Sequence, residues 1–153
     1  MAACAASAYD ENRMNTAEQN ASWRLTASPG ALQISIVDDD ASIREALRGL
    51  MRSVHWNVAT FSSAEEFLAS DRVGDSVCLI LDLYLPGMSG FELQTRLREE
   101  GRAIPIIFIT AHADEASRER ALKGGAVELL AKPVRREPLF QAIHSAIGRP
   151  PGE

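Results

Sequence analysis

The stretch Leu32-Gln33-Ile34-Ser35-Ile36-Val37-Asp38-Asp39-Asp40 decides the fold of this chain. Its apolar, β-branched first part predicts a strand over residues 32–37, and the three aspartates that follow predict an abrupt turn. Beyond the turn, apolar residues recur at helical spacing from Ile43 to Val54, on one face of an amphipathic helix. The stretch therefore indicates a strand, a turn and a helix, with acidic side chains at the carboxyl end of the strand.

The same unit repeats along the rest of the chain. Apolar runs and amphipathic stretches alternate, and they predict strands at 57–61, 77–81, 104–109 and 127–130 and helices at 63–69, 91–100, 114–123 and 135–147. Five alternating strand–helix units predict an α/β domain whose parallel sheet is covered by helices on both faces. We expect a flavodoxin-like, doubly wound (βα)5 sheet with strand order 2-1-3-4-5.

Composition narrows the function classes. The 153 residues are 46% hydrophobic and carry a net charge of -5, which disfavours direct nucleic-acid binding by this chain. No apolar run reaches the roughly 18 residues of a membrane span, and no basic segment opens a secretory signal, so we expect a cytoplasmic protein. The two cysteines, Cys4 and Cys78, lack the spacing of a disulfide framework or a structural zinc site.

The texture of the sequence divides the chain into three parts. Residues 1–30 are rich in Ala, Asn, Ser and Glu and end at a Ser-Pro-Gly sequence, which predicts a flexible N-terminal leader. Residues 31–147 form the folded domain, and residues 148–153, with two prolines and two glycines, form a C-terminal tail.

Polar side chains stand at the ends of four predicted strands. Asp38 and Asp39 follow the first, Asp82 the third, Thr110 the fourth and Lys132 the fifth. The carboxyl ends of parallel strands meet at one edge of a sheet, so all five should converge there. Carboxylates about 4 Å apart repel by up to ~4 kcal/mol per pair at an effective dielectric of about 20. An all-oxygen ligand set favours Mg²⁺ as the ion that removes this repulsion.

A carboxylate nucleophile, Mg²⁺, a lysine and a hydroxyl together suit the transfer of a phosphoryl group to an aspartate. The simpler interpretation is that strand-end aspartates cap helices and that a strand-end lysine is a solvated charge. That interpretation fits Asp40, which we expect to cap the first helix. It leaves Asp82 unexplained, because Leu83-Tyr84-Leu85-Pro86 follows it before any helix begins.

Four segments carry a resemblance to a known family: VDDDASIREAL (37–47), LILDLYLPGMSGFEL (79–93), PIIFITAHAD (105–114) and LLAKP (129–133). In this order and spacing they resemble the receiver domain of two-component response regulators, of the FixJ/NarL-like class and with a CheY-like fold. The resemblance covers about residues 31–147. It implies that Asp82 is the phosphoacceptor and that Thr110 and Lys132 contact the phosphoryl oxygens.

The resemblance also implies the remaining parts of the site. Asp39 would bind Mg²⁺ directly together with Asp82, Asp38 would bind it through water, and the main-chain carbonyl of Tyr84 would complete the protein ligands. Tyr84 and His112 would flank the site and influence the lifetime of the phosphoryl group. The Lys132-Pro133 peptide bond is expected to be cis, as in the family.

One position departs from the family pattern. Three residues before the lysine, where receivers carry an aromatic side chain that rotates as Thr110 moves inward, this chain has Leu129. Leucine has neither a ring to rotate nor a hydroxyl to offer a partner. We therefore expect the rearrangement of the responsive face, residues 111–123 and 127–136, to be smaller or to take another route.

By the same resemblance the chain is a signalling switch and not an enzyme. Its phosphoryl donor would be a histidine kinase or phosphotransfer protein, and its output a changed contact with an unidentified protein partner. A phosphorylation-dependent dimer stays open. A helix-turn-helix DNA-binding domain usually follows receivers of this class, and we expect none within these 153 residues. The chain is either a stand-alone receiver or the regulatory part of a longer transcriptional regulator.

Three other functions share parts of this pattern. A phosphatase of the haloacid dehalogenase type needs a second acid two residues after the nucleophile, where this chain has Tyr84. A flavodoxin-like cofactor binder needs a phosphate-binding loop after the first strand, where Asp38, Asp39 and Asp40 would repel a phosphate. A degenerate receiver that acts as a constitutive interaction module is suggested by Leu129, but all the acceptor residues are present.

Overall fold

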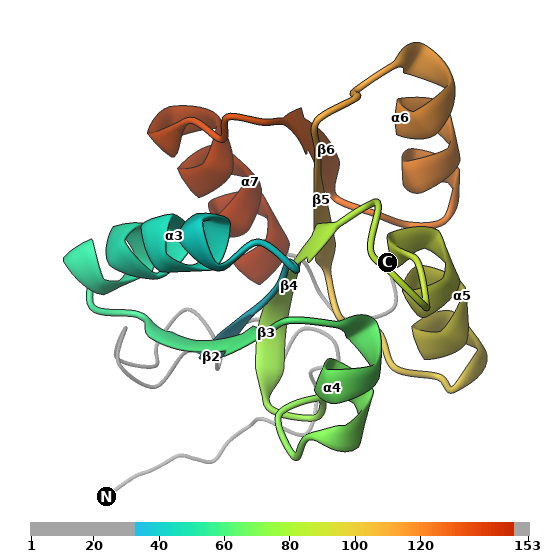
Figure 1. Cartoon of the computed structure of the whole chain (residues 1–153), viewed down its shortest axis with the longest axis horizontal. Coiled ribbons are helices and arrows are strands. Elements are labelled where there is room, and N and C mark those ends of the chain that lie inside the picture. Colours follow the sequence, from blue (N-terminus) through green and yellow to red (C-terminus); the bar gives the residue numbers. More distant parts are fainter. Residues whose placement is uncertain (1–32, 149–153) are drawn as a thin grey trace, which may run out of the picture.

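The computed structural model describes residues 33–148. They form a five-stranded parallel sheet with helices on its faces (Figure 1). The strands are β2 (Gln33–Val37), β3 (Asn57–Phe61), β4 (Ser76–Asp82), β5 (Ile106–Thr110) and β6 (Glu128–Ala131). Their order across the sheet, β3-β2-β4-β5-β6, confirms the doubly wound arrangement expected from the sequence. The expected leader (1–30), the first two residues of the expected domain (31–32, which include the expected start of the first strand) and residues 149–153 of the expected tail lie outside the described residues.

The helices cover both faces of the sheet (Figure 1). They are α3 (Ala41–Ser53), α4 (Ala64–Ala69), α5 (Gly90–Glu99), α6 (Glu115–Lys123) and α7 (Arg136–Ile147). Helices α3 and α7 enclose one apolar core, and α4, α5 and α6 enclose the other. Among the described residues, no helix combines the length and apolar composition that crossing a bilayer requires.

Strand β4 is the centre of the sheet, and all seven of its residues are buried. Alternate side chains enter opposite cores: Cys78 and Ile80 lie on the α3/α7 side, and Leu79 and Leu81 lie on the α4/α5/α6 side. Burial on both faces explains the continuous apolar run in the sequence. The strand carries Asp82 at its carboxyl end as a fixed part of the sheet.

The second strand lies at 57–61 as predicted, and most other boundaries differ from the predicted ones by one or two residues. Strand β5 was expected over 104–109 but begins at Ile106, because Pro105 has no N–H to donate and contributes only its carbonyl, which accepts a 2.9 Å hydrogen bond from Leu79. Strands β4 and β5 extend to Asp82 and Thr110, so these two residues end their strands and do not follow them.

Helix α6 has the weakest apolar attachment of the five described helices. Its one buried residue is Ala121, whereas each of the others buries at least two. Polar contacts also hold the helix: the Gln94 side chain of α5 donates to the Ala121 carbonyl at 3.1 Å, and two arginines of α6 reach neighbouring elements. Arg118 donates to the Leu129 carbonyl at 3.3 Å and pairs with Glu128 at 2.7 Å, and the Arg120 guanidinium lies 4.0 Å from the centroid of the Phe91 ring. Such partly exposed contacts each contribute only about 1 kcal/mol or less.

We expect Arg118→Ala to loosen α6 while the sheet keeps its stability. Losing the contacts to β6 should cost about 1 kcal/mol locally, which corresponds to roughly fivefold faster exchange of the α6 amide hydrogens. Native-state hydrogen exchange measures this directly. The control is Arg96→Ala, which removes the exposed ion pair between Arg96 of α5 and Glu100, the C-cap residue of the same helix. Equal exchange rates in α6 of both variants would contradict the assignment.

Candidate functional site

Three aspartates converge at the carboxyl ends of β2 and β4, which are neighbours in the sheet. Asp38 and Asp39 directly follow β2, and Asp82 ends β4. Each offers a carboxylate oxygen, and the three oxygens lie within 4.8 Å of one another. Asp38 and Asp82 are buried, whereas Asp39 is exposed. The cluster is therefore rooted in the sheet and open to solvent on the Asp39 side.

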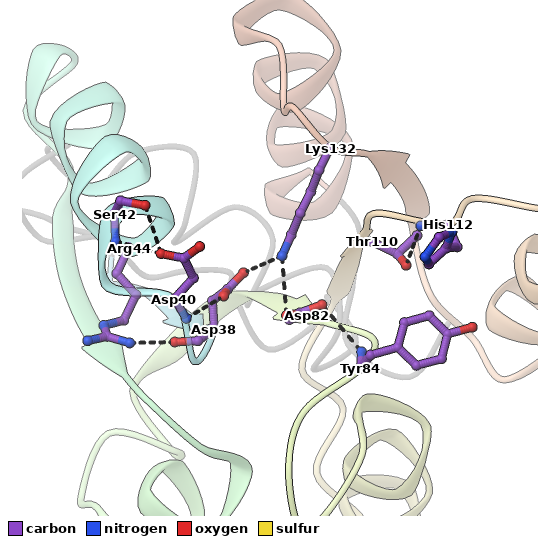
Figure 2. A network of polar contacts seen from close by, with 9 residues as sticks. All are labelled: Asp38, Asp40, Ser42, Arg44, Asp82, Tyr84, Thr110, His112 and Lys132. Carbon is purple, nitrogen blue, oxygen red and sulfur yellow. Dashed lines mark hydrogen bonds and ion pairs between the residues drawn. The ribbon is translucent and has the colours of Figure 1, made fainter.

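Lys132 lies between the two buried carboxylates. Its Nζ atom is 2.9 Å from Asp38 Oδ2 and 3.2 Å from Asp82 Oδ2 (Figure 2). The lysine follows β6, whose neighbour β5 positions it: the Lys132 N–H donates to the Thr110 carbonyl at 2.8 Å. The Lys132-Pro133 peptide bond is cis, which confirms the expectation from the sequence. One ammonium group thus offsets part of the charge of two buried carboxylates.

The pKa values of Asp82 and Lys132 are both raised, but for different reasons. Burial, and then the charge of Asp38, raise the pKa of Asp82 above its ordinary value, although Lys132 acts in the opposite direction. Burial alone would lower the pKa of Lys132, but the contacts with Asp38 and Asp82 raise it overall. Burial therefore dominates at Asp82, whereas the two carboxylates dominate at Lys132, where a single cation contacts two buried anions. The site therefore has an excess of negative charge.

The turn after β2 is held by hydrogen bonds that main-chain N–H groups donate. The Asp38 N–H donates to the Phe61 carbonyl at 3.1 Å, and the Asp40 N–H donates to Asp38 Oδ1 at 2.8 Å. Asp40 is the N-cap of α3, and its Oδ1 accepts the N–H of Ser42 at 2.9 Å, which confirms the expected cap. Asp40 therefore caps α3, whereas the side chain of Asp38 is held at the site.

Arg44 is a site neighbour that sequence reasoning missed. Its Nη1 atom donates to the Asp38 carbonyl at 2.7 Å (Figure 2). Side chains in a helix lean toward its N-terminus, so a long residue in the first turn of α3 can reach back to the turn before it. This lean toward the N-terminus is the one feature from which the contact could have been predicted from the sequence.

Thr110, His112 and Tyr84 lie on the other side of Asp82. The Thr110 side chain is buried, and its Oγ1 accepts the N–H of His112 at 3.1 Å. The Tyr84 N–H donates to Asp82 Oδ1 at 3.3 Å, and the exposed Tyr84 ring meets the His112 ring edge-on with centroids 6.5 Å apart (Figure 2). Two rings thus stand beside the buried carboxylate on its solvent side.

Helix α5 is pressed against the backbone of Asp82 through Gly90. A Cβ atom at Gly90 would lie 2.6 Å from the Asp82 carbonyl oxygen and 2.9 Å from Leu83 Cα, so no larger residue fits without movement. The helix begins there because Ser89 and Glu92 form a capping box. This close approach fixes the start of the loop that carries Tyr84.

Leu129 is buried in the α4/α5/α6 core, in register with Phe108 of β5. The aromatic neighbour of Phe108 comes instead from α5: the Phe91 and Phe108 rings are 5.4 Å apart, and Arg120 of α6 covers Phe91. The core behind Thr110 therefore connects to α6 through an aromatic pair and not through a ring on β6.

The donor atoms fit a hard divalent cation. All three side chains of the cluster are carboxylates, the ligands that Mg²⁺ prefers. Asp38 Oδ2 is fully buried and, apart from the ion pair with Lys132, receives no directed hydrogen bond from residues 33–148. It keeps lone pairs for a ligand or a metal-bound water.

Asp82→Asn should raise the free energy of unfolding of the metal-free protein at neutral pH. The folded state raises the pKa of this carboxyl, so its ionised form is less favourable in the folded than in the unfolded chain. The gain should disappear as the pH falls through the raised pKa toward the ordinary value of 3.8, because the carboxyl then binds its proton in both states. Urea unfolding with a chelator present, across this pH range, measures the difference.

The matched control is Asp71→Asn, whose side chain is 97% exposed. It should change the free energy of unfolding by less than about 0.5 kcal/mol at any pH. A loss of stability in Asp82→Asn at neutral pH would mean that the pair with Lys132 outweighs burial and the Asp38 charge.

Comparison with known proteins places this geometry in a family. A family model described as the response regulator receiver domain matches residues 34–144. Nodulation protein W of Bradyrhizobium diazoefficiens is 46% identical over 116 residues, which cover 76% of this chain and 51% of that protein. Response regulator protein TodT of Pseudomonas putida is 45% identical over 120 residues, covering 78% of this chain and 53% of that protein. The chain spans about half the length of these curated relatives.

Solved structures agree with the sequence relatives. The crystal structure of FixJ-N is 35% identical to this chain, with a TM-score of 0.68, and the match covers 76% of this chain and 93% of that one. The acidic cluster, the strand-end lysine and the sheet order thus occur together with matches in both sequence and structure. The chain belongs to the response regulator receiver domain family and is a receiver of two-component signal transduction.

Proposed function

We propose that Asp82 is the residue that takes up the phosphoryl group, from a phosphohistidine of a histidine kinase or phosphotransfer protein. The observation that carries this assignment is the contact of Lys132 with both Asp82 and Asp38. It supplies a positive charge beside a carboxylate that the backbone of the central strand holds in place. An arriving phosphoryl group would find a nucleophile and a partner for its oxygens at the same edge of the sheet.

The transfer exchanges one bond for another. A lone pair on an Asp82 carboxylate oxygen forms the new O–P bond as the P–N bond of the phosphohistidine breaks. The electron pair of the broken bond returns to the imidazole nitrogen. Such a transfer needs mainly positioning and neutralisation of the phosphoryl oxygens. Lys132 supplies the neutralising charge, and the Thr110 hydroxyl supplies a hydrogen bond once it turns from the His112 amide.

We assign Mg²⁺ to Asp39 and Asp82, with the main-chain carbonyl of Tyr84 as a further ligand and Asp38 bound through water. The ion would neutralise charge on the phosphoryl oxygens and on the acidic cluster. The exposed position of Asp39 supports this assignment, because Mg²⁺ keeps several of its waters. Tyr84 and His112, beside the site, would limit the access of attacking water and so set the lifetime of the phosphoryl group.

Phosphorylation would change a protein–protein surface, which makes the chain a switch without catalytic turnover of a substrate. The responsive face of residues 111–123 and 127–136 includes α6, which has little apolar attachment. A small bias in free energy can therefore move it. From the family we also propose a downstream protein partner, a dimer that forms on phosphorylation and a cytoplasmic setting.

We expect one phosphoryl adduct after incubation with Mg²⁺ and acetyl phosphate, measured as intact mass. Asp82→Asn and removal of Mg²⁺ should each abolish the adduct. Asp75→Asn is the control, since Asp75 is exposed and belongs to neither strand nor cluster. An adduct that persists in Asp82→Asn would contradict the assignment. No adduct in the natural chain with any phosphodonor or kinase would favour a constitutive interaction module, the alternative that Leu129 suggests.

Asp39→Asn should raise the Mg²⁺ concentration needed for half-maximal phosphorylation by about tenfold or more, because it removes a charged ligand from the ion. The saturating yield of adduct should change much less. A titration of the initial phosphorylation rate against Mg²⁺ separates the two quantities. An unchanged half-maximal concentration would exclude Asp39 as a ligand.

A further inference from the structure

Arg44 holds the turn that carries the metal-binding aspartates. Its half-buried guanidinium donates from Nη1 to the main-chain oxygen of Asp38 at 2.7 Å, a charge-assisted hydrogen bond (Figure 2). The residue lies in the first turn of α3, whose own N-cap is Asp40. The Arg44 side chain thus extends from α3, past the N-cap residue Asp40, to the main chain of Asp38, which directly precedes the exposed Asp39.

The contact fixes the peptide group between Asp38 and Asp39. That group is planar, so holding its carbonyl also sets the direction of the Asp39 N–H and Cα. The opposite side of Asp38 is already held, because its N–H donates to Phe61 and its Oδ1 accepts from Asp40. Arg44 adds the restraint on the side from which the exposed Asp39 departs.

We propose that Arg44 is a positioning residue for the metal site: it orders the Asp38–Asp39 peptide so that the Asp39 carboxylate is preorganised for Mg²⁺. The inference rests on the proposed function, in which Asp39 is a metal ligand. Partners that orient a ligand without touching the metal typically change metal affinity by about 10- to 100-fold. The hydrogen bond from Arg44 to the Asp38 carbonyl, and its position in the first turn of α3, suit this positioning role.

The sign of the effect separates positioning from charge. A guanidinium beside an acidic cluster repels a divalent cation, so Arg44 acting through its charge alone would weaken Mg²⁺ binding. Its removal would then tighten binding. If Arg44 acts by holding the turn, its removal weakens binding although a positive charge is lost. The two roles predict opposite changes in the same measured quantity.

The experiment is an NMR titration of the unphosphorylated protein with Mg²⁺, following the amide signals of Asp38, Asp39 and Asp82. We expect Arg44→Ala to weaken Mg²⁺ binding by roughly tenfold, and Arg44→Lys, which keeps a charged donor, to recover a large part of the loss. The control is Arg48→Ala: Arg48 lies one turn along α3, and its Nη2 atom donates to Thr60 Oγ1 at 2.7 Å. It removes the same charge without touching the turn, so binding should stay unchanged or tighten slightly.

Urea unfolding of each variant without metal separates positioning from a general loss of fold. Unchanged or tighter Mg²⁺ binding in Arg44→Ala overturns the inference while the proposed metal site stands. Weakening by the same factor in Arg44→Ala and Arg48→Ala also overturns it, because the effect would then belong to the helix. Failure of the natural protein to bind Mg²⁺ would overturn the metal site itself, and the role of Arg44 with it.

Discussion

The contact of one ammonium group with two buried carboxylates is the interaction on which the site depends. Without Lys132, Asp38 and Asp82 would face each other at the end of adjacent strands with no opposing charge. With it, the cluster still has an excess of negative charge, visible in the raised pKa that burial and Asp38 give to Asp82. Lys132 thus offsets enough negative charge for the site to fold, and the negative charge that is left favours the binding of a further cation. This balance is what makes it suited to receive Mg²⁺ and a phosphoryl group together.

The fold supplies this balance by topology. Residues from three distant parts of the sequence meet because the carboxyl ends of β2, β4 and β5 lie side by side, and the edge strand β6 delivers Lys132. The first turns of two helices also hold the backbone of the site. Asp40 caps α3, Arg44 reaches back from it, and Gly90 lets α5 press on the backbone of Asp82. The positions of the charged groups are thus set by rigid elements, whereas α6 is attached more loosely, through one buried alanine and polar contacts.

Sequence patterns predicted the strand order, the alternation of elements and the Asp40 cap, because periodicity, capping and crossover handedness are local or general rules. Strand limits at Pro105 and Thr110 shifted because the hydrogen bonds of neighbouring strands decide them. The ion pairs of Lys132 with Asp38 and Asp82 could not be predicted at this detail, since they depend on how side chains from different elements are directed. The Arg44 contact was missed because periodicity alone does not indicate it, although the lean of helix side chains toward the N-terminus permits it. The same holds for the Phe91–Phe108 pair beside Leu129, which no spacing in the sequence indicates.

The central claim is that Asp82, Lys132 and Thr110 form one site for a phosphoryl group, and a crystal structure with Mg²⁺ and beryllofluoride tests it most directly. The account predicts the fluoride adduct on an Asp82 carboxylate oxygen, with Lys132 Nζ and Thr110 Oγ1 within hydrogen-bond distance of its fluorine atoms and Mg²⁺ on Asp39. An adduct on another residue, or one on Asp82 while the Thr110 hydroxyl still accepts the His112 N–H and Lys132 stays on Asp38, would contradict it.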